Sequence, residues 1–486
     1  MIHKTPPEDA MTVIPACPVF NDCGGCKYNA LSYEKQLIEK QKQLEKLLGA
    51  FCAVSPIRGM DDPLHYRHKV HQVLARGEGG SISGGYYAAG SHRVVTVPSC
   101  RLDDEACQAV IRTVCRLAKE FGLPVYNEYK KTGLLRHIMV RKSRATGQMM
   151  VILVAASPQL HGKTKFVQQL TAAHPKVTSV ILNVNDRRTS MVLGEKNITL
   201  FGPGYLTDTL CGLRFKLSPS SFFQVNPVMT EPLYETAMDF AGLSGTETVI
   251  DAYCGTGTIG LIAAERAREV IGAELNASAV RDARENARAN NIRNARFVHA
   301  DAGRFMTELA ARGEHADVVF LDPPRSGCTP EFVNALLRLA PNRVIYISCG
   351  PESLARDLTA LTKGDYTVSA IQPWDLFPMT APVETVVLLV RKNPDTYINV
   401  KLDLDELDLT SAEAKATYDE IKDYILKEHG VKVSTLYIAQ TKRKCGLEVG
   451  EHYNKSNKDE AKQAQCPEDK EKLIIEALRH FKMISA

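Results

Sequence analysis

The sequence predicts an α/β protein organised around a doubly wound, Rossmann-like domain at residues 206–393. In this range short apolar runs alternate with helical patterns, which is typical of a mainly parallel sheet with helices on both faces. The run that ends at Ile250 is followed by Asp251 and a glycine-rich turn that opens a helix, and the next run carries Glu274. Such a turn lets the backbone approach a nucleotide, and an acid after the second strand can accept hydrogen bonds from a ribose. We therefore expect a cofactor that carries a nucleoside.

The charges of the 486-residue chain are unevenly spread. Residues 1–205 hold 27 Lys and Arg against 16 Asp and Glu, a net charge of +11, while the whole chain has +4. A basic N-terminal part indicates an anionic partner, with nucleic acid first and a solvated basic surface as the alternative. No apolar stretch approaches the roughly 18 residues of a membrane span, and the N-terminus lacks the apolar core of a secretory signal. We expect a cytoplasmic monomer without membrane contact, whose 13 cysteines are reduced, metal-bound or catalytic.

The first landmark along the chain is the segment CPVFNDCGGC, which holds Cys17, Cys23 and Cys26. The last two have the spacing that can chelate one metal centre, and a tetrahedral ion or a cube-shaped cluster normally takes four protein ligands. Cys100 is preferred as the fourth because it falls in a predicted loop. The other candidates are Cys52, Cys107 and Cys115, of which the last two fall on the apolar face of a predicted helix. Free thiols are the alternative, and the spacing leaves zinc and iron–sulfur both open.

A β-rich module follows the cysteine segment. A helix is predicted at 31–48, with lysines on its polar face. This face is expected to contact an RNA backbone, and an alternative that is at least as good is that it faces solvent. Residues 52–200 alternate short apolar runs with turns at a period of about two, which predicts strands interrupted by helices at 103–121 and 161–173. Several basic residues of the module flank strands and suit contacts with an RNA backbone. The basic residues are Arg67, Lys69, Arg136, Arg141, Lys142, Arg144, Arg187 and Arg188.

The tail after the Rossmann-like domain is predicted to be helical, with helices at 410–428, 434–444 and 469–481. Thr410 or Ser411 is placed to cap the first of them. Such a module suits binding, but its slight negative charge argues against a grip on phosphates, so its function stays unassigned. The predicted parts of the chain are therefore 1–50 with the cysteine segment, the β-rich module at 51–205, the Rossmann-like domain at 206–393 and the tail at 394–486.

The glycine-rich turn alone does not identify the cofactor. Its glycines, Gly255, Gly257 and Gly260, also suit an NAD-dependent dehydrogenase. Asp251 before Gly-Thr-Gly, together with Asp-Pro-Pro at the end of a later strand, favours S-adenosylmethionine. Methyltransferases of exocyclic amines place an aromatic residue after such a Pro-Pro pair, whereas Arg325 stands here. Another methyl acceptor is therefore expected.

Cys349 suggests that acceptor, because it ends the strand RVIYIS at the edge that faces the cofactor turn. A thiolate that adds to carbon 6 of a pyrimidine makes carbon 5 nucleophilic enough to take a methyl group, and a base must then remove the carbon-5 proton. Glu384, at the start of the last strand, is placed to be that base. The alternative for Cys349 is a small buried apolar residue, and Cys254 and Cys328 are rivals. Arg325 is a candidate for lowering the pKa of the thiol.

At these residues the chain resembles the RNA uracil-5-methyltransferases, in particular the iron–sulfur branch that acts on 23S ribosomal RNA. The resemblance covers roughly residues 17–392 and rests on CPVFNDCGGC, GLLRHIMVRKS, SPSSFFQVNP, DAYCGTGTIG, DPPRSG, YISCGP and FPMTAPVE. It implies Cys349 as nucleophile and Glu384 as proton acceptor. It implies contacts to S-adenosylmethionine from Gln224, Tyr253, Glu274 and Asp322, and a 4Fe-4S cluster on Cys17, Cys23, Cys26 and Cys100.

The chain departs from that family in two places. Only 16 residues precede Cys17, so we expect the small β-barrel RNA-binding domain of many members to be absent. The usual FPQT-x-H-x-E reads FPMTAPVE, with Met379 and Pro382 in place of polar residues, which puts the hydrogen bonding around Glu384 in question. The alternatives are a transfer-RNA uracil-5-methyltransferase, a non-catalytic RNA-binding protein and an NAD oxidoreductase.

Overall fold

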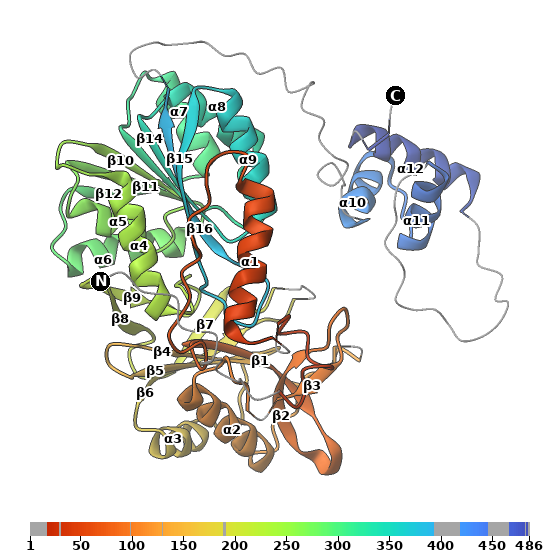
Figure 1. Ribbon diagram of the computed structural model, residues 1–486. Coiled ribbons are helices and arrows are strands. Elements are labelled where there is room, and N and C mark those ends of the chain that lie inside the picture. The colour runs from red at the N-terminus through yellow and green to blue at the C-terminus, as the bar shows by residue number, and fades with distance from the viewer. Residues whose placement is uncertain are drawn as a thin grey trace. The chain divides into compact units, whose positions relative to one another are not determined.

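The predicted Rossmann-like sheet is present. The computed structural model describes residues 17–28, 31–97, 99–128, 130–187, 191–392, 418–445, 466–481 and 483–484. The sheet has the order β12-β11-β10-β13-β14-β16-β15, parallel from β12 to β14 and antiparallel at β16 and β15 (Figure 1). The α/β fold class expected from the alternating pattern is therefore confirmed. The strands are β10 (Thr248–Ala252), β11 (Glu269–Glu274), β12 (Ala295–His299), β13 (Val318–Leu321), β14 (Arg343–Ser348), β15 (Tyr366–Trp374) and β16 (Glu384–Arg391).

Helices cover both faces of this sheet, as the doubly wound pattern requires. One apolar core joins β10 to the helices α4, α5 and α6, and a second core joins the other face to α7, α8 and α9. Side-chain caps begin several of these helices, for example Asn276 at α6 and Asp301 at α7. The helices are α4 (Pro227–Ala241), α5 (Thr258–Ala264), α6 (Ala277–Ala289), α7 (Ala302–Ala311), α8 (Pro330–Leu339) and α9 (Pro351–Lys363).

The β-rich module forms a second sheet, with the order β3-β2-β1-β4-β5-β6-β7. The helices α2 (Glu105–Glu120) and α3 (Lys163–Ala173) pack on one face, while residues of its other face share a core with α4 and the hairpin of β8 (Leu206–Leu210) and β9 (Leu213–Leu217). The two sheets thus belong to one compact unit. The strands are β1 (Lys69–Arg76), β2 (Ile82–Tyr87), β3 (Val94–Thr96), β4 (Leu135–Lys142), β5 (Met149–Ala155), β6 (Val177–Val184) and β7 (Lys196–Phe201), and a short 3-10 helix, η1, spans Glu78–Gly80.

Helix α1 (Tyr33–Leu48) packs on the Rossmann-like domain. Leu44 and Leu48 lie in the core that α7 to α9 share. The prediction that the lysines of this helix face solvent or RNA is wrong for Lys40. This side chain is buried and forms an ion pair of 2.7 Å with the buried Asp375. Separating the two charges would leave each of them buried without a partner, which is costly. The ion pair therefore holds α1 against the segment between β15 and β16.

The C-terminal residues form a separate unit. The helices α10 (Tyr418–His429), α11 (Thr435–Lys444) and α12 (Glu468–His480) enclose a small apolar core that includes Ile421, Ile438 and Ile474. The prediction of three helices is confirmed for these residues, whereas the expected start and cap at Thr410 or Ser411 lie outside the described residues. Among the residues that the structure describes, no helix is long and apolar enough to cross a membrane.

Candidate active site

The register of the parallel strands brings the predicted site residues to one edge. Ala252 pairs with Ala273 and with Leu321, so Tyr253 after β10, Glu274 at the end of β11 and Asp322 after β13 come at the same level. Ser348 pairs with Thr385 across the antiparallel pair β14 and β16, so Cys349 and Glu384 come next to each other. The carboxyl ends of parallel strands meet at one edge, which is where such folds bind ligands. The edge therefore holds both the cofactor candidates and the catalytic candidates.

The glycine-rich turn leaves room for a ligand. Gly260 N donates to Asp251 Oδ2 at 2.7 Å and Gly255 N donates to Glu274 Oε2 at 3.1 Å, so both acids hold the turn. A Cβ atom added to Gly255 would meet nothing within 4 Å, and its φ of +53° favours glycine. Asp251 Oδ1 is buried with no hydrogen-bond partner among the described residues. The open space beside acceptors suits a nucleoside with hydroxyl donors.

Buried carboxyl groups line the same edge. Burial, together with the charges of Asp322 and Glu274, raises the pKa of Asp251 to about 8, although the hydrogen bond from Gly260 N lowers it. Burial also raises the pKa of Asp322 to about 7 and that of Glu384 to about 8, where Asp322 adds to the shift. Like charges in a poorly solvated place disfavour one another, and a cation bound among them would restore their ionised forms.

Cys349 is half-buried beside Glu384 and Arg325. Burial and the charge of Glu384 raise the pKa of the thiol, while the charge of Arg325 and a hydrogen bond from it lower that pKa. Arg325 thus lowers the pKa of the Cys349 thiol, as predicted, but burial raises that pKa by more. The rival Cys254 is buried in the core between α5 and α6, and Cys328 donates to Tyr346 Oη at 3.7 Å in the opposite core. Of these thiols, Cys349 is the one that faces the Glu384 carboxyl.

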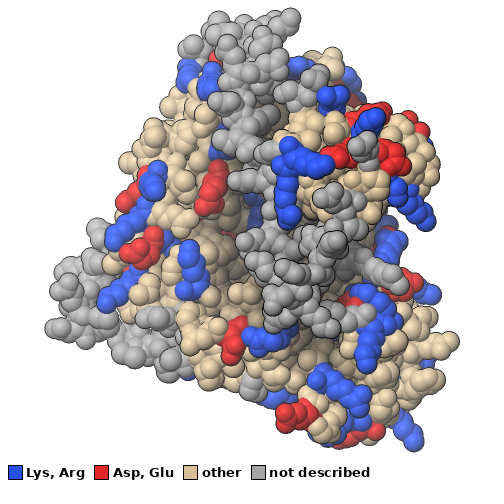
Figure 2. Space-filling view, turned by 90° about the vertical axis from the view of Figure 1, so that its right-hand side faces the viewer, with Lys and Arg blue, Asp and Glu red and all other residues tan. Residues whose placement is uncertain are grey.

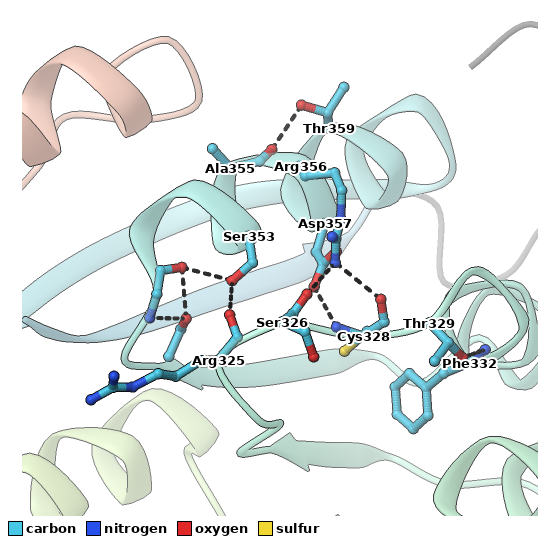
Figure 3. Close-up of polar contacts among 12 residues, drawn as sticks. Arg325, Ser326, Cys328, Thr329, Phe332, Ser353, Ala355, Arg356, Asp357 and Thr359 are labelled. Atoms are coloured by element: carbon cyan, nitrogen blue, oxygen red, sulfur yellow. Dashed lines mark hydrogen bonds and ion pairs between the residues drawn. The ribbon is translucent and has the colours of Figure 1, made fainter. Parts of the chain in front are cut away.

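The segment after Asp322 is held in place by residues of α9 (Figure 3). Asp357 Oδ2 accepts from Cys328 N at 2.7 Å and from Tyr346 Oη at 2.6 Å, and Arg356 Nη2 donates to Ser326 O at 2.8 Å. A Cβ on Gly327, whose φ is +81°, would lie 2.6 Å from Asp357 Oδ2. In Figure 3 the Arg325 side chain points away from this cluster. The backbone is therefore fixed on one side while Arg325 extends on the other.

Replacing Asp357 with Asn should loosen this segment, because an amide cannot accept all the hydrogen bonds that the carboxylate accepts. We expect a loss of roughly 2–3 kcal/mol in the free energy of unfolding, which is the usual cost of unsatisfied buried donors. Asp322 and Arg325 would then be less well placed, so turnover should also fall. Thermal unfolding and steady-state kinetics measure the two effects. Glu352→Gln, an exposed change on the same helix, is the control, and equal behaviour of the two variants would contradict the role of Asp357.

The remaining predicted cofactor residues occupy different surroundings. The Tyr253 ring lies 5.3 Å from that of Phe332, and its backbone has φ of +68°, which turns the chain out of β10. Gln224 is buried in the segment before α4. Sequence reasoning missed Tyr234, a buried α4 residue whose phenol faces Asp322 and Glu384. A single tyrosine on an amphipathic helix gives no signal that would distinguish it from core packing.

Three of the four predicted cluster cysteines, Cys23, Cys26 and Cys100, come from two distant segments that pack together. Cys26 and Cys100 pack against Tyr66, Leu102 and Met379, while Cys23 and Cys100 pack against Val95 and its neighbours. Burial is the main cause that raises the pKa of Cys26 to about 11, while the charge of Arg67 lowers it and Cys23 and Cys17 add smaller increases. In the described part of the chain no group of three or more His, Cys, Asp or Glu residues is arranged to hold a metal ion.

Comparison with known proteins identifies the family. The family model described as tRNA (uracil-5-)-methyltransferase matches residues 209–392. A Halalkalibacterium halodurans protein named as an uncharacterised RNA methyltransferase is 42% identical over 382 residues, which are 78% of this chain and 83% of that protein. The chain belongs to the RNA uracil-5-methyltransferase family. A similarly named Bacillus cereus protein is 39% identical over 77% of this chain and 82% of its own length.

A solved member of this family has a similar fold. The crystal structure of a Pyrococcus abyssi tRNA (uracil-54, carbon-5) methyltransferase in complex with S-adenosyl-L-homocysteine matches with a TM-score of 0.64 and 27% identity. The match covers 76% of this chain and 86% of that one. The chain is accordingly an S-adenosylmethionine-dependent RNA methyltransferase of the uracil-5 family, as the motifs at the strand ends had indicated.

Proposed function

We propose that this chain methylates carbon 5 of a uridine in 23S ribosomal RNA. The observation that carries the proposal is the meeting of Cys349 and Glu384 at the edge where the glycine-rich turn ends. The Cys349 thiolate adds to carbon 6, and the electron pair released at carbon 5 attacks the methyl group of the sulfonium, which leaves as S-adenosylhomocysteine. Glu384 then takes the carbon-5 proton, the double bond re-forms, and the thiolate departs.

Ribosomal RNA is proposed as the substrate because of the cysteine segment. The resemblance to the iron–sulfur branch rests on Cys17, Cys23, Cys26 and Cys100, and that branch acts on 23S ribosomal RNA. Transfer RNA is the second candidate, since the similar Pyrococcus abyssi enzyme is named for uracil 54 of transfer RNA. Mass spectrometry of nucleosides from both RNAs, in cells with and without the gene, separates the two. Loss of 5-methyluridine from 23S RNA alone is expected, and loss from transfer RNA alone would contradict the proposed substrate.

The buried acids support a cationic methyl donor, with Gln224, Tyr253, Glu274 and Asp322 as proposed contacts. Their surroundings give a pH prediction. Asp251 and Glu384 have pKa values of about 8 and Asp322 of about 7, so these groups lose protons as the pH rises through 7 to 8. The affinity for the S-adenosylmethionine sulfonium should therefore rise about tenfold from pH 6 to pH 9 and level off above it.

Isothermal titration with both forms of the cofactor measures this pH dependence. S-adenosylhomocysteine is the control, because it shares the amino acid and nucleoside but lacks the sulfonium charge. Its affinity should change much less over the same range. Equal pH profiles for the two ligands would show that the carboxyl groups do not interact with the sulfonium.

The proposed ligands of an iron–sulfur cluster are Cys17, Cys23, Cys26 and Cys100, because thiolates are the usual protein ligands of such clusters. The cluster would cross-link the cysteine segment to the loop before α2. Protein purified without oxygen should contain about four iron and four sulfide ions per chain. Cys100→Ser should lose most of both. Cys52→Ser is the matched control, because Cys52 is a half-buried thiol near Ser369 and away from these four. Zinc alone in the wild-type protein, or full iron content in Cys100→Ser, would contradict the proposed ligands.

A further inference from the structure

A cavity of about 540 Å³ separates the cysteine segment from the segment before β16. This volume falls within the range of about 300–1,000 Å³ that is usual for small-ligand sites. Its walls include the cationic side chains of Lys27, Arg67, Lys69 and Arg325, together with the rings of Tyr86 and Phe377. The cavity therefore combines several positive charges with aromatic surface.

The positive charge of this cavity is not balanced from within. Among the described residues that line it, none is Asp or Glu, and no ion-pair partner of Lys27 or Lys69 is found in the described ranges. Asp103, which does not line the cavity, offsets part of the charge of Arg67, while its Oδ2 accepts from Tyr86 at 2.6 Å and from Gln72 at 3.3 Å. Within the described part of the wall, the positive charge without a carboxylate partner is therefore that of Lys27 and Lys69. Burial and the charge of Arg141 lower the pKa of Lys69 to about 7, so an anion bound beside Lys69 would favour its charged form. Unpaired cations in a partly desolvated place favour an anionic ligand.

A second polar group in the wall also lacks a partner. Nε2 of His71 is buried, and no described residue forms a hydrogen bond with it. His71 follows Lys69 by two residues on β1, so both side chains are on the same face of the strand. A ligand with several acceptor oxygens would satisfy His71 and Lys69 together.

The cavity also adjoins the catalytic pair. Arg325, one of its wall residues, acts on both Cys349 and Glu384. The opposite wall is tied to the same region, because Lys27 N and Tyr28 N donate to Met379 O at 2.8 and 3.1 Å. A uridine rotated out of its stack toward Cys349 keeps its phosphates attached, so they must lie close to that thiol.

We propose that this cavity binds a phosphate of the substrate RNA next to the target uridine, with Lys69 and Lys27 as its main contacts. The proposal rests on the proposed function for the identity of the RNA. Figure 2 shows Lys and Arg side chains interspersed with Asp and Glu on one face of the molecule, without one continuous basic patch among the coloured residues.

Salt dependence of RNA binding tests the two contacts. The probe is a short RNA that contains the uridine mapped in cells, and its affinity is measured over a range of salt concentrations. Lys69→Gln and Lys27→Gln should each reduce the slope of log K against log salt by about 0.7 and weaken binding severalfold, because each loses one phosphate contact. Lys163→Gln, an exposed change on α3, should do neither. Unchanged S-adenosylmethionine affinity in all three variants shows that they are folded.

Neutral methylphosphonate linkages locate the contact. Replacing one flanking phosphate should weaken binding to the wild-type chain severalfold, and the same replacement should cost Lys69→Gln nothing further. Additive losses at every flanking phosphate, or a Lys69→Gln variant that binds like Lys163→Gln, would overturn the proposal. The combination of the Lys69→Gln variant with the methylphosphonate replacement measures binding only. It therefore tests the phosphate contact even if the wild-type chain leaves this uridine unmethylated. That result would count against the proposed function instead.

Discussion

Replacement of Cys349 with Ala should abolish the formation of 5-methyluridine. Without the thiolate, carbon 5 of the uracil ring is not made nucleophilic, so no step of the proposed reaction can begin. The loss of a covalent nucleophile costs other enzymes roughly 10⁴-fold or more in turnover, and a similar loss is expected here. Transfer of a labelled methyl group to RNA, followed by nucleoside analysis, measures it.

The control for this variant must separate chemistry from folding. Cys349 is half-buried after β14, so Ala should fit without disturbing the sheet. Binding of S-adenosylmethionine and of RNA should therefore stay within a few-fold of the wild type. Cys52→Ser should keep full activity. Methylation by Cys349→Ala above the background of an RNA-only sample would disprove its role as nucleophile.

Replacement of Glu384 with Gln should instead stop the reaction after methyl transfer. Gln has nearly the same size but cannot take the carbon-5 proton, so the thiolate cannot leave and the RNA stays bound to the protein. Turnover should fall by about 10²–10⁴-fold, the usual contribution of a general base. A protein–RNA species that survives denaturation and carries the new methyl group is the expected product.

The same variant changes the pH dependence of adduct formation. In the wild type, the charge of Glu384 raises the pKa of the Cys349 thiol. Gln removes that charge, so the thiolate should form at lower pH and the rate of adduct formation should reach its plateau earlier. Glu331→Gln, an exposed change on α8, should leave the profile unchanged. Normal turnover without a stable adduct in Glu384→Gln would exclude this residue as the base.

The positions of the candidate catalytic and cofactor residues were predictable because they follow from strand order. Parallel strands end at one edge, so Tyr253, Glu274 and Asp322 had to meet once the alternating pattern was recognised. The approach of Glu384 to Cys349 follows from the antiparallel β16, whose direction the apolar pattern does not reveal. The chemistry of carbon-5 methylation suggested Cys349 and Glu384 as a pair, and the resemblance of YISCGP and FPMTAPVE implied the same roles.

Contacts between distant segments could not be predicted. Lys40 reads as one of several lysines on a helix, and its burial depends on Asp375, which is 335 positions away. Asp357 likewise reads as an ordinary helical acid, yet it holds the segment that carries Asp322 and Arg325. Hydrophobic periodicity describes which face of a helix is apolar, but it carries no information on the partner of a buried charge.

The covalent role of Cys349 is tested most directly with RNA in which the target uridine is replaced by 5-fluorouridine. Fluorine at carbon 5 cannot be removed as a proton, so methyl transfer should leave the RNA attached to the protein. Wild-type protein with S-adenosylmethionine should form a denaturation-resistant complex, and peptide mass spectrometry should find the modified uracil on Cys349. A complex attached at another residue, or release of a methylated product from this RNA without any covalent complex, would contradict this role.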